Sequence, residues 1–421
     1  MVWFPADRDD APGWRLDVVS LLAILGESLL ARHVQPLSAS RLCLLPRLLP
    51  APQSFLKASR PNRLPRTPAI VCGVYSGTMI HEVNYFAETL LPIDGLEKYQ
   101  VAVYNIMWTK KRKRTRRPWE RLTKAFIPSS LRSKSQQPNY ETPVPPRALS
   151  PINAVTVVSF LLTVGAFIWA AWIHDGAAAL ALAAMSLASS LIGLALHWES
   201  DLTTRPTDGP APEGDVVIRT RDGAFVIIQC SEEIARELYM GPEECNYLVG
   251  DQWFTILVGL SMLLVIVSIL LLGNCGWTMQ AVITVIYIVL NVLYWAASLL
   301  PQNWYWDMSR YDCVDVTPKH LKSAHEPRPA GERPSYTRSL GYAIQATGEV
   351  DWVRISGAAP KTRAWDTWLE SAHYNVGNRD WDAVGEKDRL MRESHSRQPP
   401  QRRHRLPEDA QITMPVRRGT A

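Results

Sequence analysis

The chain has 421 residues, of which 47% are hydrophobic and 20% are charged, and its formal net charge is +5. Its six cysteines form no C-x-x-C pair, and no histidine stands at zinc-ligand spacing from two of them, which argues against a disulfide framework and a zinc module. The apolar residues are concentrated in two blocks between polar, proline-rich flanks, which favours a membrane protein over one globular domain.

The N-terminal region, residues 1–68, is rich in Leu, Pro, Arg and Ser in an irregular order. Its central part lacks acidic residues, as a transit peptide does, but Asp7, Asp9 and Asp10 precede it. Residues 16–31 contain an uncharged run that is too short to span a bilayer, and the sequence leaves open whether this part inserts in or lies on the membrane. We expect residues 1–68 to be disordered.

Residues 69–109 are expected to form a small folded segment. Apolar residues recur there at helical spacing, which predicts a helix over Ile80, Val83, Ala87, Leu90 and Leu91. His81 and Glu82 begin an H-E-x-x-H motif, but position 85 is Tyr, so no metalloprotease site is expected.

Residues 110–150 combine a basic run with a proline-rich linker. Seven of the eight residues from 110 to 117 are basic: Lys110, Lys111, Arg112, Lys113, Arg114, Arg116 and Arg117. The run is either a solvated orientation signal or a contact to anionic lipid, where each basic residue contributes about 1 kcal/mol. Nuclear-envelope sorting is a lesser alternative. Nucleic-acid binding is not expected, because no accompanying fold or interleaved aromatic residues are present.

Four apolar runs are each long enough to cross a bilayer: residues 152–173, 177–197, 253–272 and 277–300. The third holds fourteen Leu, Ile, Val or Phe residues, which together favour insertion by about 4–8 kcal/mol. Short turns join the runs in pairs, which predicts two transmembrane hairpins over 151–198 and 252–300.

The charges around these runs predict their orientation. The turns HDG and GNCG contain no Lys or Arg, whereas the flanking segments do. The positive-inside rule therefore places both termini and the middle loop in the cytosol. Spans of this length fit the endoplasmic reticulum and the plasma membrane equally well.

The middle loop, residues 199–251, is acidic, with twelve Asp or Glu against four Arg. DVVIRTRDGAFVIIQC predicts two strands around a tight turn, and SEEIARELYM predicts a helix capped by Ser231. We therefore expect a small cytosolic ββα unit. Five glutamates on this unit form an acidic cluster: Glu232, Glu233, Glu237, Glu243 and Glu244. We expect the cluster to be a solvated helix face in preference to a cation site. The loop is also a candidate surface for a protein partner.

After the fourth span, residues 301–376 are expected to form a cytosolic helical region. Residues 361–376 place Trp365, Trp368, Leu369 and Ala372 on one stripe, which predicts packing on the ββα unit, with the membrane interface as the alternative. Residues 377–421 are charged and rich in Pro and Arg, which predicts a disordered tail. The predicted fold class is thus an α-helical membrane protein: four transmembrane helices in two hairpins, with the ββα unit between them and cytosolic helical flanks.

No chemistry-bearing motif stands out. The four apolar runs contain no Asp, Glu, Lys or Arg, and Asn291 is the most polar residue in the fourth, where it more often joins helices than binds a substrate. We therefore predict no catalytic, cofactor-binding or metal-binding residue and no cofactor.

The sequence favours a non-enzymatic scaffold or interaction protein with a cytosolic face for a partner or lipid. The alternative is a small-solute or lipid transporter acting as a homo-oligomer, and a membrane-bound enzyme is third.

Three segments carry a resemblance: VVIRTRDGAFVIIQCSEEIARELYMGPEECNY, LYWAASLLPQNWYWD and WVRISGAAPKTRAWDTWLESA. They are similar to a group of multi-pass membrane proteins of filamentous fungi that have no assigned activity. The resemblance covers residues 69–376, and it implies an architecture without a function.

Overall fold

The computed structural model describes residues 27–109, 144–202, 209–327, 333–378 and 381–397. Within them, four helices are long and apolar enough to cross a membrane: α5 (Pro151–Trp172), α6 (Gly176–Leu196), α8 (Asp251–Leu272) and α9 (Trp277–Ser298). The four predicted spans are therefore confirmed as apolar helices. The basic residues 110–117 lie outside the described residues.

Side chains fix the ends of these helices. Ser150 accepts a hydrogen bond from the Asn153 N–H, and Pro151 occupies the first turn of α5, where its missing N–H is harmless. At the opposite end Asp175 accepts from the Ala178 N–H at 2.9 Å and from the Gly276 N–H at 2.7 Å. Asp175 thus caps α6 and ties the α5–α6 turn to the α8–α9 turn.

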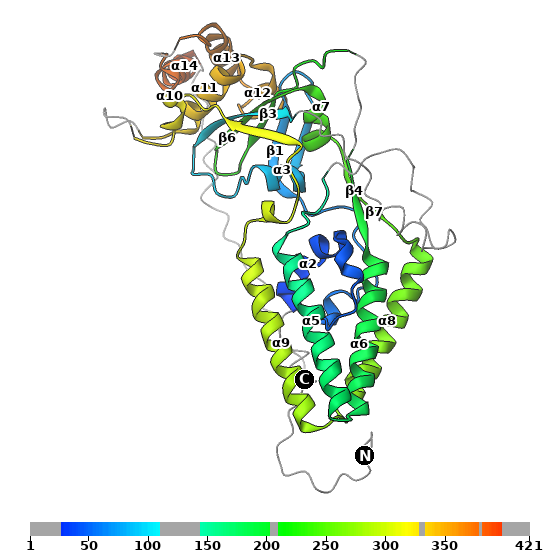
Figure 1. Ribbon diagram of the computed structural model, residues 1–421. Helices are drawn as coiled ribbons and strands as arrows, with labels where there is room; N and C mark the ends of the chain where they lie inside the picture. Colours follow the sequence, from blue (N-terminus) through cyan, green and yellow to red (C-terminus); the bar gives the residue numbers. More distant parts are fainter. Residues whose placement is uncertain (1–26, 110–143, 203–208, 328–332, 379–380, 398–421) are drawn as a thin grey trace, which may run out of the picture.

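The four helices form one bundle that narrows toward these turns (Figure 1). Its closest helix pair is α6 with α8, and α5 packs on both α6 and α9. Helix α8 buries a single stripe, at one residue per turn, and leaves most of its remaining residues exposed. The buried residues are Phe254, Val258, Ser261, Val265, Ser268 and Leu272. The strongest contact therefore runs between the two predicted hairpins.

A six-stranded sheet stands beyond the wide end of the bundle, so the fold mixes helices with a sheet (Figure 1). Its order is β2 (Met79–Val83), β1 (Thr67–Gly73), β5 (Val216–Arg219), β6 (Phe225–Cys230), β3 (Val101–Trp108) and β8 (Tyr311–Asp315). All neighbours are antiparallel except β3 and β6, which pair in parallel from Val101↔Phe225 to Ile106↔Cys230. Helices α5 and α6 lie between these two strands in the chain.

The middle loop differs from the expected independent unit. Strands β5 and β6 do surround a tight turn, with Gly223 at φ 81°, but β5 also pairs with β1 and β6 with β3. The predicted helix is a short α7 (Glu232–Ile234) followed by a π-helical turn, η4 (Ala235–Met240). Because a lone hairpin is marginally stable, incorporation into the larger sheet is the physical reason for the difference. A second ribbon, β4 (Trp198–Leu202) with β7 (Glu243–Tyr247), continues α6 and precedes α8.

The helix predicted near residue 80 is also shorter than expected. Ile80 and Val83 belong to β2, and α3 covers only Tyr85–Leu90. The apolar spacing there spans the end of a strand and the start of a helix, so the periodicity alone could not separate them.

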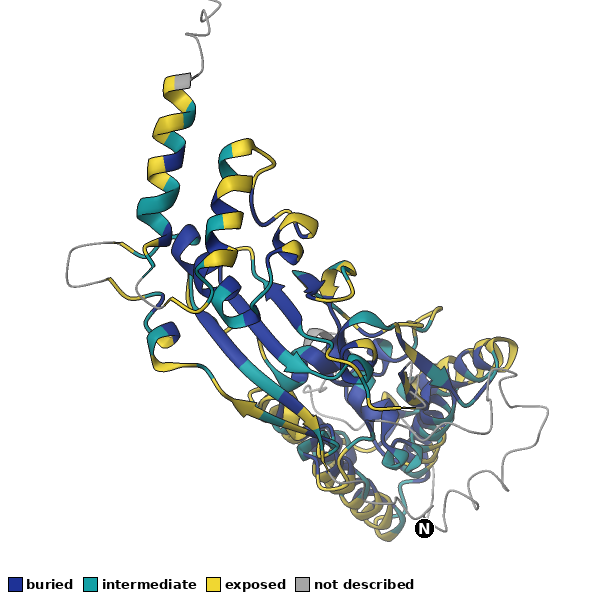
Figure 2. Ribbon diagram, turned by 90° about the horizontal axis from the view of Figure 1, so that it is seen from above, coloured by how far each residue is buried: buried dark blue, intermediate teal, exposed yellow. Residues whose placement is uncertain are grey.

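In the described part of the chain five helices follow β8, and they lie at the end of the sheet far from the bundle (Figures 1 and 2). They are α10 (Lys319–Lys322), α11 (Tyr336–Thr347), α12 (Asp351–Ile355), α13 (Arg363–Tyr374) and α14 (Ala383–Arg397). Trp368, Leu369 and Ala372 of the predicted stripe are buried against this cluster. The predicted disorder from 377 onward is wrong for α14, because Ala383 and Leu390 pack on α11 and α13.

The N-terminal region differs most from expectation. From residue 27 onward it is ordered, with α2 (Glu27–Ala39), η1 (Arg41–Leu44) and η2 (Pro52–Ser54). Helix α2 lies among the wide ends of the spanning helices (Figure 1). Its Leu37 is buried in the core that joins the bundle to the sheet.

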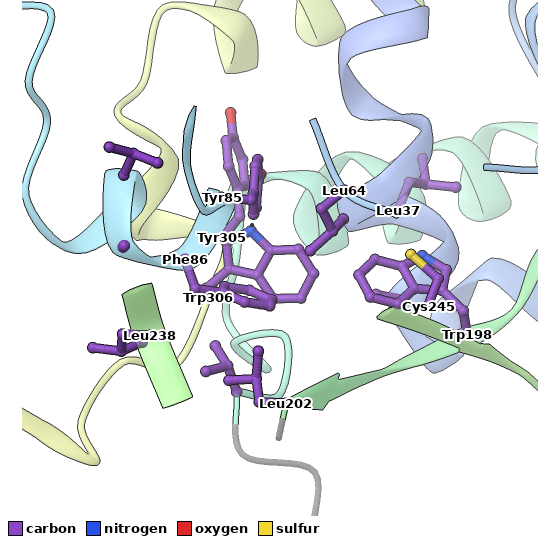
Figure 3. Packing of buried hydrophobic residues seen from close by; sticks show 14 of the residues in the cluster. Leu37, Leu64, Tyr85, Phe86, Trp198, Leu202, Leu238, Cys245, Tyr305 and Trp306 are labelled. Carbon is purple, nitrogen blue, oxygen red and sulfur yellow. Dashed lines mark hydrogen bonds between the residues drawn. The ribbon is translucent and has the colours of Figure 1, made fainter. Parts of the chain in front are cut away.

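One hydrophobic core joins the bundle to the sheet (Figure 3). Trp306, just after α9, packs edge-to-face on Phe86 of α3 with ring centroids 5.1 Å apart, and its indole N–H donates to the Tyr85 hydroxyl. Trp198 of β4 lies 5.7 Å from Trp306, ring to ring. The two parts are therefore one packed body and not two domains on a linker.

Candidate functional site: a segment inserted into the bundle

Residues 40–55, here called the inserted segment, run inside the helix bundle in a largely non-helical conformation. Prolines at 46, 50 and 52 interrupt any regular helix, so the segment makes only two short 3₁₀ turns. Leu48 and Leu49 are 0% and 2% exposed, because they pack among the spanning helices. A chain interrupted in this way leaves backbone groups that need partners in a place without water.

Helix α5 supplies two of those partners. The Thr163 Oγ1 accepts from the Leu48 N–H at 2.8 Å, and the Ser159 hydroxyl donates to the Leu48 carbonyl at 2.7 Å. Thr163 stands 12 residues into a 22-residue helix, or about 18 Å along its axis at 1.5 Å per residue. The inserted segment therefore reaches the middle of the span.

Two more helices hold the same segment. The Tyr287 hydroxyl of α9 donates to the Leu49 carbonyl at 3.0 Å, and the Ser189 hydroxyl of α6 accepts from the Arg47 N–H at 3.2 Å. Gly193 of α6 has no side chain for a steric reason: a Cβ there would lie 2.1 Å from the Cys43 carbonyl oxygen. Three spanning helices thus bind the backbone of the segment by hydrogen bonds or direct contact.

Arg47 brings a positive charge into the wide end of the bundle, where its guanidinium lies beside Tyr294, four residues before the end of α9. Its side chain is 1% exposed, and one guanidinium nitrogen donates to the Leu42 carbonyl at 2.9 Å. The Tyr294 phenol lies beside the guanidinium, and no acceptor among the described residues lies within hydrogen-bond distance of the Arg47 Nε–H. Across the described ranges no Asp or Glu forms an ion pair with Arg47. A buried cation without a counter-charge is energetically expensive.

A second arginine shows the contrast. Arg60, at the mouth of the bundle, lies 2.7 Å from the Asp251 carboxylate and 4.1 Å from the centre of the Tyr247 ring. The Arg60 charge is thus compensated by a carboxylate, whereas no carboxylate in the described part of the chain pairs with Arg47.

The Cys43 thiol and the His197 imidazole do not form a nucleophilic site. The Cys43 sulfur lies 3.8 Å from the His197 Nδ1, but that nitrogen is 2.9 Å from the Ser38 carbonyl. A bond to a carbonyl requires the proton on Nδ1, so His197 cannot take the thiol proton there. The pair is a structural contact, and beside it lies a cavity of about 10 Å³ lined by Cys43, Arg47, Ser189 and apolar residues.

The residues singled out by sequence fall elsewhere. Asn291 donates to the Tyr287 carbonyl of its own helix at 2.8 Å, so it does not bind the inserted segment. No group of three or more His, Cys, Asp or Glu that could hold a metal ion occurs in the part of the chain that the structure describes.

The acidic cluster is divided between separate roles. Glu243 accepts the Tyr85 and Phe86 N–H groups at the start of α3, at 2.8 and 3.1 Å, and burial raises the pKa of its carboxyl to about 7. Glu237 accepts from the Tyr311 hydroxyl at 2.6 Å. Both are buried and stabilise the junction, so they offer no exposed acidic face.

Sequence reasoning missed Arg47 and the hydroxyls that surround its segment. The available signal was LLPRLLP, residues 44–50, in which one basic residue sits between leucine pairs and prolines.

Comparisons with protein-family models, with curated proteins and with solved structures gave no match.

Proposed function

We propose that this protein is a small-solute transporter or channel in which the solute passes the inserted segment. The observation that carries the proposal is the non-helical backbone of residues 47–49, bonded to α5, α6 and α9 at mid-span. Irregular backbone at this depth is characteristic of selectivity filters, re-entrant loops and broken transporter helices, which place binding groups near the middle of the bilayer.

The proposed topology places the sheet on the cytosolic side. The bundle consists of two hairpins, α5–α6 and α8–α9, whose turns face away from the cytosol, and both chain ends are cytosolic. The lack of Lys and Arg in the two turns supports this orientation. The membrane is that of the endoplasmic reticulum or the cell surface, and the basic residues 110–117 contact its anionic lipids.

A second candidate is an interaction protein without transport. It is favoured by the continuous core between bundle and sheet, and by the outer strand β2, where Met79, His81 and Glu82 are exposed. An exposed edge strand can accept a further strand from a partner. The loop of residues 199–251 and a homo-oligomeric contact are the other partner surfaces of this candidate.

Flux through reconstituted protein separates the two candidates. Proteoliposomes holding the full chain are challenged with a panel of small neutral, cationic and anionic solutes, and permeation is followed by osmotic swelling. We expect a solute flux above that of empty liposomes. In the double variant Ser159→Ala and Thr163→Val, the rate of flux should differ from the wild-type rate by about tenfold or more.

The control is Ser261→Ala in α8, because the Ser261 hydroxyl donates to the Leu257 carbonyl of its own helix. This variant should behave as the wild type. Absence of flux for every solute, with folded protein in the membrane, would remove the transport proposal and leave the interaction protein.

A further inference from the structure

We propose that the Asp175 carboxylate is a latch that holds the narrow end of the bundle closed, and that the two transmembrane turns separate there when a solute passes. This inference rests on the proposed transport function and names its gate. A solute at the inserted segment has reached only mid-span, and its way onward leads between the α5–α6 turn and the α8–α9 turn. Transporters open such ends by rocking one group of helices against the other around a fixed central site.

The narrow end is closed by close packing of the two hairpins. The buried residues that meet there come from both hairpins and are at most 4% exposed: Ala166, Ala170, Ala178, Ala181, Leu272, Met279 and Ile283. Small side chains such as alanine allow helix backbones to approach closely. The hairpins are therefore in direct contact at this end while their turns stay together.

The Asp175 carboxylate joins the two turns. Its Oδ1 accepts the Ala178 N–H at 2.9 Å and caps α6, and its Oδ2 accepts the Gly276 N–H at 2.7 Å. Gly276 is the N-cap residue of α9, so the carboxylate lies between the first turns of two spanning helices. Helix N-termini attract negative charge, and hydrogen bonds to a charged acceptor are stronger than neutral ones. One side chain thus ties two segments that are 101 residues apart in the chain.

The Asp175 bridge is better suited to opening than the bonds at mid-span. It is exposed, so water can hydrogen-bond both partners when the turns separate. The bond between Thr163 and the Leu48 N–H is buried, where water cannot replace it. About one turn deeper than the bridge, the Ser268 hydroxyl donates to the Ala181 carbonyl at 2.9 Å, and a wider separation breaks this bond as well. A rocking motion therefore releases the bridge first and keeps the inserted segment as its pivot.

The alternative role for Asp175 is a simple N-cap of α6. Asp175→Asn separates the two roles, because asparagine keeps an acceptor oxygen for the Ala178 N–H and presents an N–H donor to Gly276. Gly276→Pro removes the donor of the bridge and retains the Asp175 charge, and the Gly276 φ of −61° suits proline. Ser150→Ala is the control, because Ser150 caps α5 at the wide end, far from both turns.

The test uses the full chain in nanodiscs and follows the Cys275 thiol, which lies in the α8–α9 turn and is 7% exposed. Its rate of maleimide labelling reports how often the turn opens. We expect labelling to be about tenfold or more faster in Asp175→Asn and in Gly276→Pro than in the wild type, because each loses a hydrogen bond to a charged group. Ser150→Ala should label at the wild-type rate.

A second measurement removes the effect of charge on the thiol. Burial and the Asp175 charge raise the pKa of the Cys275 thiol to about 12, so Asp175→Asn also makes this thiol more reactive. Hydrogen exchange of the two turns is therefore measured in parallel, because it does not depend on the thiol pKa. We expect both turns to exchange faster in both bridge variants.

Two results would overturn the inference. One is wild-type exchange rates at both turns in Asp175→Asn, and the other is a wild-type Cys275 that reacts as fast as an exposed thiol. If Gly276→Pro does not fold, hydrogen exchange in Asp175→Asn alone decides.

The latch and the transport proposal fail in different ways. In proteoliposomes the flux through Asp175→Asn should exceed the wild-type flux severalfold, because its gate opens more often. Faster exchange in the bridge variants without flux of any solute refutes transport and keeps the latch. Wild-type flux together with wild-type exchange in both variants refutes the latch alone.

Discussion

Replacing Thr163 by Val removes the hydroxyl that holds the inserted segment at mid-span and preserves the branched shape of the side chain. Its Oγ1 accepts the Leu48 N–H at 2.8 Å, and Leu48 is 0% exposed, so water cannot serve instead. A buried donor that loses its acceptor costs about 1–3 kcal/mol. The matched control is Thr284→Val, whose hydroxyl donates to the Gln280 carbonyl of its own helix, and we expect it to cost less than about 0.5 kcal/mol.

The labelling rate of the Cys43 thiol measures this effect. Cys43 lies in the inserted segment and is 1% exposed, so a maleimide reaches it only when the segment leaves the bundle. In nanodiscs, with labelling read peptide by peptide, a loss of 1–3 kcal/mol speeds the reaction about 5- to 150-fold. Cys275, buried in the α8–α9 turn, serves as the internal reference. Equal Cys43 rates in the Thr163 and Thr284 variants would refute the idea that this hydroxyl holds the segment.

Three further predictions concern stability in detergent or nanodiscs. Gly193→Ala should lower the free energy of unfolding by about 1–3 kcal/mol, because the new Cβ meets the Cys43 backbone. Gly165→Ala, where a Cβ meets open space, should leave it unchanged, and equal unfolding midpoints for the two variants would contradict the close contact at Gly193. The free energy of unfolding should fall by up to about 3 kcal/mol as pH rises from 4.5 to 7, because the pKa of Glu243 is raised to about 7 and the folded state keeps a proton that the unfolded state has released. Glu243→Gln should flatten this part of the pH profile, and an unchanged slope in that variant would argue against a role for Glu243. Trp306→Ala should cost about 3–5 kcal/mol by opening a cavity between bundle and sheet, and a loss below 1 kcal/mol would show that the two parts are not coupled there.

The spanning helices could be predicted because each carries its own evidence. A run of about 20 apolar residues has to cross the bilayer wherever its neighbours lie, so residues 253–272 are recognisable without tertiary information. The turn at Gly223 and the buried stripe with Trp368 were also visible, since both depend on local spacing.

The sheet and the inserted segment depend on distant residues and were not predictable. Strand β6 pairs with β3, more than a hundred residues earlier, and no local pattern specifies that partner. Leu48 obtains its hydrogen bonds from Thr163 and Ser159, which the sequence presents as ordinary polar residues of a membrane helix. Segments whose order is supplied by remote partners resemble disordered chain when they are read alone.

The inserted segment also has a consequence for how the protein is made. It is synthesised early, yet Thr163 follows Leu48 by 115 residues, Ser189 follows Arg47 by 142 and Tyr287 follows Leu49 by 238. At about 5–20 residues per second, the ribosome needs roughly 10–50 s to reach Tyr287 after it has made Leu49. For that time the leucines and the guanidinium have no binding site, and some other surface has to shield them. Assembly therefore runs against the order of synthesis: the last spanning helix must be in place before the inserted segment can dock fully.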